Sequence, residues 1–171
     1  MNIVQAEIIP QPISGTFEER TYTINHLGVS SIWTWIKFTD ENYKVWVSCF
    51  RGKPLFCVKS NIKNELLILT SDILIRLDCR NAEIIEYEDD HFYHDLTLSP
   101  KGEFIIAECY HIYRIKNNLS NKIDIIEPFQ MDFIKFNHWK NNTLYFNCDE
   151  IITYKNFDMK LDINNWSIKK I

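Results

Sequence analysis

Hydrophobic and polar residues alternate along much of this chain with a period of two. The alternation is clearest in residues 32–38, 43–50, 73–78 and 143–147. A half-buried strand shows this period because successive side chains point to opposite faces of a sheet. No long window carries a helical period. We therefore predict an all-β chain whose strands are joined by turns at polar pairs and at segments containing Gly or Pro.

The order of predicted strands and turns recurs along the sequence. Each recurrence reads as four short strands, and together they occupy residues 54–87, 95–127 and 132–168. Equivalent apolar positions on the second strands, Leu67, Ile105 and Leu144, are separated by 38 and 39 residues. Such a spacing indicates stacked structural units of one kind rather than an irregular β-fold.

A four-stranded antiparallel unit of about 40 residues resembles a blade of a β-propeller. Residues 96–106 carry the resemblance most clearly, because an apolar strand, the Ser-Pro-Lys-Gly turn at 99–102 and a second apolar strand follow one another. The resemblance covers residues 54–171 and lacks the Trp-Asp and Gly-His dipeptides of WD repeats. It implies antiparallel four-stranded blade-like sheets, with a generic antiparallel meander as the alternative.

The number of units predicts an incomplete array. Closed propellers need at least about four blades, and this chain has material for three, or for four if residues 29–53 form a degenerate one. We expect one all-β domain over 1–171, a propeller-like array of three to four blades: N-terminal strands and a degenerate blade in 1–53, then blades at 54–90, 91–130 and 131–171. Free sheet edges are hazards, so the N-terminal strands (3–9 and 17–24), a second copy of the chain or a partner would cover them.

Motifs for chemistry are absent from the sequence. The 171 residues include only 4 Gly, which excludes most phosphate-cradling loops. No G-x-S-x-G, H-E-x-x-H, Walker or EF-hand pattern occurs. His26, His111 and His138 belong to no motif, so each is expected to be structural. We predict that the chain is not an enzyme and uses no cofactor and no metal.

The sequence also indicates a compartment. Its beginning lacks a basic segment followed by an apolar core, and no apolar run approaches the ~20 residues that span a bilayer. The five Cys are widely spaced without a C-x-x-C pair, which favours free thiols in a reducing cytoplasm. The net charge of −4 disfavours direct nucleic-acid binding and suits a basic partner. We expect a cytoplasmic protein that contacts no membrane.

Negative charge is concentrated in residues 86–95, which contain five acids and two His but no Lys or Arg. Three interpretations are open: a solvated connection between blades, an acidic recognition patch, or a metal site using His91, His94 and a carboxylate. Clustered carboxylates accelerate and orient docking, and aromatic neighbours can anchor it. The residues predicted to bind a partner are Glu86, Glu88, Asp89, Asp90, Phe92, Tyr93 and Asp95.

Tryptophans form a second feature. Trp33 and Trp35 share one face of a predicted strand and Trp46 lies on the next strand. We expect all three to fill the core because each buries a large area. A stacking surface for a sugar or a base is the alternative.

These features favour a non-enzymatic protein-binding module. Small, acidic proteins without catalytic motifs resemble the immunity proteins that neutralise toxins, and the composition rich in Ile, Asn and Lys is typical of AT-rich bacterial genomes. The resemblance implies a cytoplasmic immunity protein that inhibits a cognate bacterial toxin, such as a nuclease, by covering its basic active site. The alternatives are a small hydrolase using Asp, Glu and His at a propeller-like rim, and a structural module that completes a propeller by self-association through open sheet edges.

Overall fold

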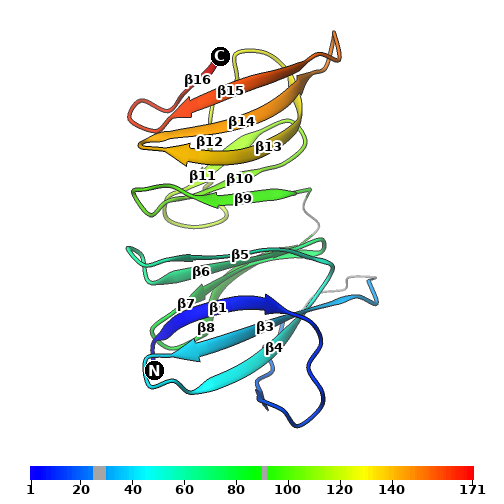
Figure 1. Cartoon of the computed structure of the whole chain (residues 1–171), viewed down its shortest axis with the longest axis vertical. Coiled ribbons are helices and arrows are strands. Elements are labelled where there is room, and N and C mark those ends of the chain that lie inside the picture. The colour runs from blue at the N-terminus through cyan, green and yellow to red at the C-terminus, as the bar shows by residue number, and fades with distance from the viewer. Residues whose placement is uncertain (25–29, 90–91) are drawn as a thin grey trace. The chain divides into compact units, whose positions relative to one another are not determined.

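The computed structural model (Figure 1) describes residues 1–24, 30–89 and 92–171. The chain divides into two compact units, Met1–His91 and Phe92–Ile171, and each is described by itself. Every regular element of the described residues is a strand, and the sixteen strands form four four-stranded sheets. The prediction of an all-β chain with blade-like, mostly antiparallel four-stranded sheets is therefore confirmed.

The first unit contains two sheets. The N-terminal sheet has the strand order β1-β3-β4-β2, with β1 at Ile3–Ile9, β2 at Glu18–Glu19, β3 at Trp33–Asp40 and β4 at Val45–Arg51. Strand β2 pairs parallel with β4, whereas the other pairs are antiparallel. The second sheet follows chain order and consists of β5 (Pro54–Ser60), β6 (Glu65–Thr70), β7 (Ile73–Asp78) and β8 (Glu83–Asp89).

The core of the first unit joins apolar side chains of both sheets. Trp46 is fully buried there and stacks on Phe38, with ring centroids 5.4 Å apart and an interplanar angle of 8°. Trp33 differs from the prediction, because its side chain is 47% exposed and lies under the Arg51 guanidinium. Strand alternation explains this position: Thr34, the next residue along β3, points to the opposite face and is buried.

The second unit also contains two sheets, and every strand pair in them is antiparallel. One sheet has the order β12-β11-β10-β9, with β9 at Asp95–Leu98, β10 at Phe104–Ala107, β11 at Ile112–Ile115 and β12 at Ile123–Asp124. The other runs in chain order through β13 (Met131–Lys140), β14 (Thr143–Glu150), β15 (Asn156–Asp162) and β16 (Ser167–Lys170).

The turn between β9 and β10 shows why the sequence folds as predicted here. Gly102 has a φ of 80°, a backbone conformation that only glycine adopts without strain. Its N–H donates to the Ser99 carbonyl at 2.9 Å, and the Ser99 hydroxyl accepts a hydrogen bond from the Glu103 N–H at 3.0 Å. The tight turn aligns the two strands, so that their apolar side chains reach the core.

Apolar residues from both sheets of the second unit form one core. They include Ile112 on β11 and Ile125 just after β12, which are both buried. Packing of these two isoleucines fixes which way the hairpin of β11 and β12 faces, and this orientation positions the polar side chains considered below.

Candidate functional site

The acidic segment predicted to bind a partner belongs to both units. Glu86, Glu88 and Asp89 lie on β8 in the first unit, whereas Phe92, Tyr93 and Asp95 belong to the second. Asp90 and His91 lie outside the described residues. The role of these residues in partner binding stays a prediction, but the structure shows what each described side chain contacts.

Glu86 forms an ion pair within its own sheet. The Arg76 guanidinium on β7 donates to Glu86 Oε1 at 2.5 Å and to both carboxylate oxygens of Glu65 at 2.6 and 2.9 Å. Burial disfavours the charged guanidinium, but the hydrogen bonds with Glu65 and Glu86 outweigh it and raise the pKa of Arg76. One positive charge thus serves two carboxylates, which leaves a net negative charge on the trio.

Asp95 and Tyr93 support the second unit from within. Asp95 is only 7% exposed, and its carboxylate accepts hydrogen bonds from the backbone N–H groups of Leu96 at 2.8 Å and Phe136 at 2.7 Å. The bond from Phe136 ties β9 to β13. Desolvation by burial raises the pKa of Asp95, although these two hydrogen bonds act in the opposite direction. Tyr93 is buried and its ring lies beneath Lys122 Nζ.

The other two described residues of the segment in the second unit are His94 and Phe92, and they differ in exposure. His94 Nε2 lies 2.6 Å from the Ile134 carbonyl oxygen and donates to it. Phe92 is 75% exposed. Among the described members of the segment in the second unit, Phe92 is therefore the side chain with surface to offer a partner.

Strand β8 carries a row of exposed side chains at the end of its sheet. It pairs with β7 alone among the described strands. Glu83, Ile85, Tyr87 and Asp89 occupy alternate positions along it and are all exposed. Acidic and large apolar groups therefore stand next to one another on a terminal strand, and the second half of this strand overlaps the segment 86–95 where the sequence predicts recognition.

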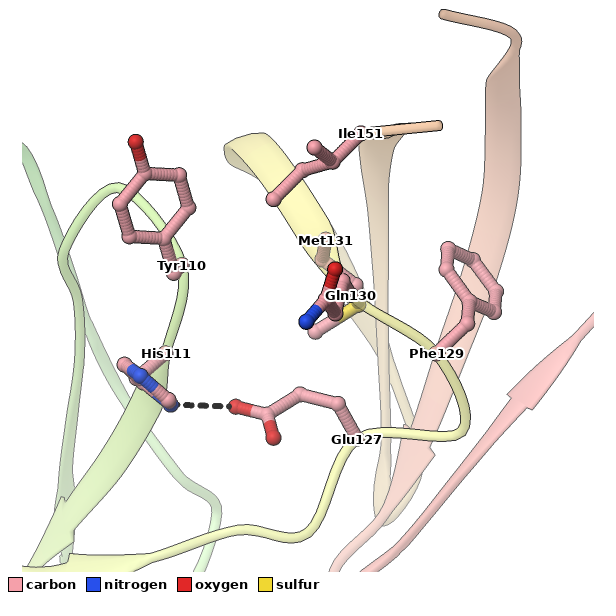
Figure 2. Close-up of a pocket in the computed structure, with 7 residues that line it drawn as sticks. All are labelled: Tyr110, His111, Glu127, Phe129, Gln130, Met131 and Ile151. Atoms are coloured by element: carbon pink, nitrogen blue, oxygen red, sulfur yellow. Dashed lines mark hydrogen bonds and ion pairs between the residues drawn. The ribbon is translucent and has the colours of Figure 1, made fainter. Parts of the chain in front are cut away.

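A pocket of about 560 Å³ lies in the second unit (Figure 2), at a place that the sequence analysis did not single out. Three connections meet around it: the turn between β10 and β11, the segment between β12 and β13, and the turn after β14. Its lining consists of Tyr110, His111, Glu127, Phe129, Gln130, Met131 and Ile151. In Figure 2, Tyr110 and Phe129 stand on opposite sides of the view, and His111 faces Glu127.

Strand pleating explains why polar groups collect at this pocket. Ile112 points into the core, so the side chains of His111 and Tyr113 point to the other face of the strand. Asp124 is the cross-strand partner of Tyr113 and shares that face. The chain then leaves β12, and the segment up to β13 brings Glu127 to the same group. The Ile151 N–H donates to the Gln130 carbonyl at 3.1 Å and ties this segment to the turn after β14.

His111 is the centre of this polar group. Its Nδ1 donates to Glu127 Oε1 at 3.0 Å and lies 3.8 Å from Asp124 Oδ1. Tyr113, whose ring centroid is 5.9 Å from that of His111, donates its hydroxyl proton to Glu108 at 2.8 Å. Burial, followed by the hydrogen bond to Glu108 and the charges of the nearby carboxylates, raises the pKa of Tyr113.

The sequence predicts a structural role for His111 and does not single out this arrangement. The only signal in the sequence is that Asp124 and Glu127 follow it by 13 and 16 residues, separations that a hairpin can bring together. Such a separation is common and does not by itself distinguish these carboxylates from others. Chemically, the site combines two carboxylates and an imidazole with apolar walls, which suits a cation or a proton-transfer pair.

Comparisons with known proteins add little to this description. No family model matches the chain, and no curated protein matches it. A solved structure of the dihydro-heme d1 dehydrogenase NirN in complex with DHE is similar to it, with 13% sequence identity and a TM-score of 0.49. The match covers 80% of this chain and 42% of that one, so the chain spans less than half of that protein's length. In the described part of the chain, no helix is long and apolar enough to cross a membrane.

Proposed function

We propose that this chain is a non-enzymatic protein-binding module whose partner is a basic protein. The observation that carries the proposal is the exposed row on β8, in which Glu83 and Asp89 flank Ile85 and Tyr87. In its finer form, the proposal is a cytoplasmic immunity protein that inhibits a cognate bacterial toxin by covering a basic active site.

The terminal position of β8 supports this assignment. The outer edge of a terminal strand presents backbone N–H and C=O groups that another chain can pair with. Ile85 and Tyr87 would supply apolar contact area beside those groups, and an exposed Tyr is a frequent anchor in interfaces. Backbone pairing would give affinity, and the alternating side chains would give selectivity.

Charge supports a basic partner rather than an acidic one. Arg76 neutralises only one of its two carboxylates, so Glu65 and Glu86 together keep a surplus negative charge beside β8. Glu83, Glu88 and Asp89 also place carboxylates on the strand itself. A surface of one sign accelerates association with a partner of the opposite sign, and the acceleration falls as salt screens it.

The test uses the protein encoded by the neighbouring gene as the candidate partner. Binding to the purified chain is measured by calorimetry at several salt concentrations, and rescue of growth is scored when both proteins are expressed together. The triple variant Glu83→Lys, Glu88→Lys and Asp89→Lys is expected to bind more than about tenfold more weakly and to lose most of the salt dependence.

The matched control is Glu41→Lys, a charge reversal at an exposed turn of the same unit. It is expected to bind as the unchanged protein does. Equal affinities and salt dependences of the triple variant and the control would overturn the assignment to β8. Absence of both binding and rescue by the unchanged chain would overturn the immunity proposal. A mass that rises with concentration in sedimentation would instead support self-association of the chain.

A second candidate function is favoured by the pocket of the second unit. A hydrolase at this site would use His111 as a general base that Glu127 orients through the 3.0 Å hydrogen bond. The seven lining residues include no Ser, Thr or Cys, so water activated by His111 would be the nucleophile of such an enzyme. Hydrolysis of ester or phosphoester test substrates that His111→Gln abolishes would support this function, and absence of turnover would exclude it for those substrates.

A further inference from the structure

We propose that His111, Asp124 and Glu127 form a binding site for a divalent first-row transition metal, and that Zn²⁺ fits it best. The proposal is independent of the protein-binding function, because these residues belong to the second unit and β8 to the first. The sequence predicts no metal, and the three residues form no sequence motif.

The donor atoms of the three side chains converge on one point. One donor atom from each of the three residues lies within 4.8 Å of the other two. Zn²⁺ binds imidazole nitrogen and carboxylate oxygen at about 2.0–2.2 Å, so tetrahedral ligand atoms stand roughly 3.4 Å apart. The distances of 3.0 and 3.8 Å from His111 Nδ1 to the two carboxylates lie on either side of this value. Small side-chain rotations would therefore complete the coordination.

The chemical types of the ligands favour a transition metal. An imidazole is a ligand of Zn²⁺, Cu²⁺, Ni²⁺ and Fe²⁺, whereas Ca²⁺ and Mg²⁺ prefer oxygen ligands alone. Neutral imidazole binds the metal through the lone pair of Nδ1, and the proton held there against Glu127 moves to Nε2 through solvent. The ring stays neutral, and the two carboxylates balance the two positive charges of the ion.

Negative charge gathers around the group. The Glu127 and Asp124 carboxylates lie 3.0 and 3.8 Å from His111 Nδ1, and the nearby Glu108 carboxylate accepts the Tyr113 hydroxyl proton at 2.8 Å. A single histidine faces them within this cluster. Bringing carboxylates together costs free energy unless a cation compensates them, and a bound divalent ion would supply that compensation.

The pocket gives the site an open coordination position. Three protein ligands leave the fourth position of a tetrahedral ion vacant for water or a ligand. His111 and Glu127 line the 560 Å³ pocket, so this position would face a cavity with Tyr110 and Phe129 on its sides (Figure 2). The Tyr113 hydroxyl donates to the Glu108 carboxylate at 2.8 Å. This bond would help to fix the face of the β11–β12 hairpin that carries His111 and Asp124.

The experiment is a calorimetric titration of the full chain with ZnCl₂ in a buffer that does not chelate metal. One Zn²⁺ per chain is expected. His111→Ala, Asp124→Asn and Glu127→Gln are each expected to weaken binding more than about tenfold. Bound Co²⁺ is expected to show a visible ligand-field spectrum without the near-ultraviolet charge-transfer band that thiolate ligands produce.

Two control variants identify the ligands. His138→Ala removes another exposed histidine of the same unit, and Cys109→Ser removes an exposed thiol two positions before His111. Both are expected to bind Zn²⁺ as the unchanged chain does. Unfolding midpoints of the metal-free variants show whether each remains folded, and the nearly isosteric Glu127→Gln carries the test if His111→Ala does not.

Three outcomes would overturn the site: no stoichiometric binding by the unchanged chain, unchanged binding by a folded Glu127→Gln variant, or loss of binding in Cys109→Ser. None of them bears on the proposed function, which is measured by partner affinity and by growth rescue. Conversely, failure of partner binding would leave the metal titration interpretable.

Discussion

Replacement of Arg76 by Met tests whether the first unit depends on a shared ion pair. Arg76 lies between Glu65 and Glu86 on three neighbouring strands, and its side chain is 8% exposed. Methionine keeps most of the side-chain volume but removes the positive charge and its donors. Two carboxylates that are 14% and 22% exposed would then face one another without a cation.

The expected loss of stability follows from this burial. Removing one member of a buried ion pair costs about 3–5 kcal/mol, because the remaining charge stays buried and uncompensated. The partial exposure of Glu86 lets water screen its charge, so we expect about 3 kcal/mol, near the lower limit. For a chain of this length, that loss lowers the thermal midpoint by about 6–12 °C.

The assay is urea unfolding followed by tryptophan fluorescence. Trp46, which is buried in the core of the first unit, contributes to this signal. The triple variant Arg76→Met, Glu65→Gln and Glu86→Gln is expected to recover most of the lost stability, because neutral amides need no cation. Arg80→Met is the matched control: Arg80 pairs with Asp78 at the surface, and its side chain is 68% exposed.

Water screens an exposed pair of this kind, so the control is expected to unfold at nearly the same urea concentration as the unchanged chain. Two results would refute the reasoning. One is a loss of stability in Arg76→Met no larger than that in Arg80→Met. The other is a triple variant as unstable as Arg76→Met, which would show that packing of the Arg76 side chain, rather than its charge, matters.

The remaining predictions concern a turn, a buried acid and the thiols. Gly52→Ala is expected to cost about 2–3 kcal/mol in urea unfolding, because φ is 103° and an added Cβ would lie 2.6 Å from Thr70 Oγ1; Gly15→Ala, where no atom lies within 4 Å, should cost less. The folded state raises the pKa of Asp95. The stability that the protonated carboxyl contributes is therefore complete below about pH 4 and is lost as the pH rises through the raised pKa. The pH dependence of the unfolding free energy should be shallower in Asp95→Asn, and identical profiles would contradict this. With a thiol-specific dye, exposed Cys109 is expected to react before unfolding, whereas buried Cys79, whose pKa is raised to about 11 chiefly by burial, should react only afterwards; equal rates in the folded protein would contradict this.

Local patterns in the sequence were sufficient for the secondary structure and for part of the organisation. Alternation with a period of two identifies strands because the pleat of a single strand imposes it. The Ser99–Gly102 turn was predictable for the same reason, since its geometry depends on a few adjacent residues. A four-stranded meander in chain order, such as β5 to β8, needs only such local hairpins.

Features that depend on distant segments were less accessible. The pairing of β1 with β3, and the parallel pairing of the two-residue β2 with β4, connect parts of the chain that no local pattern relates. The exposure of Trp33 was mispredicted because the size of a side chain favours burial, whereas its register on β3 decided which way it faces.

The sequence by itself determined an all-β protein of repeated four-stranded units, with negative charge gathered near residue 90. Only the tertiary structure decided how individual charges are used: Glu86 shares Arg76 with Glu65, Asp95 accepts hydrogen bonds from backbone N–H groups, and His111 meets two carboxylates beside a pocket. The physical reason is that period and turn chemistry act between neighbours in the chain. The free energy of a charge depends instead on which groups surround it in space, and strand pairing sets those groups.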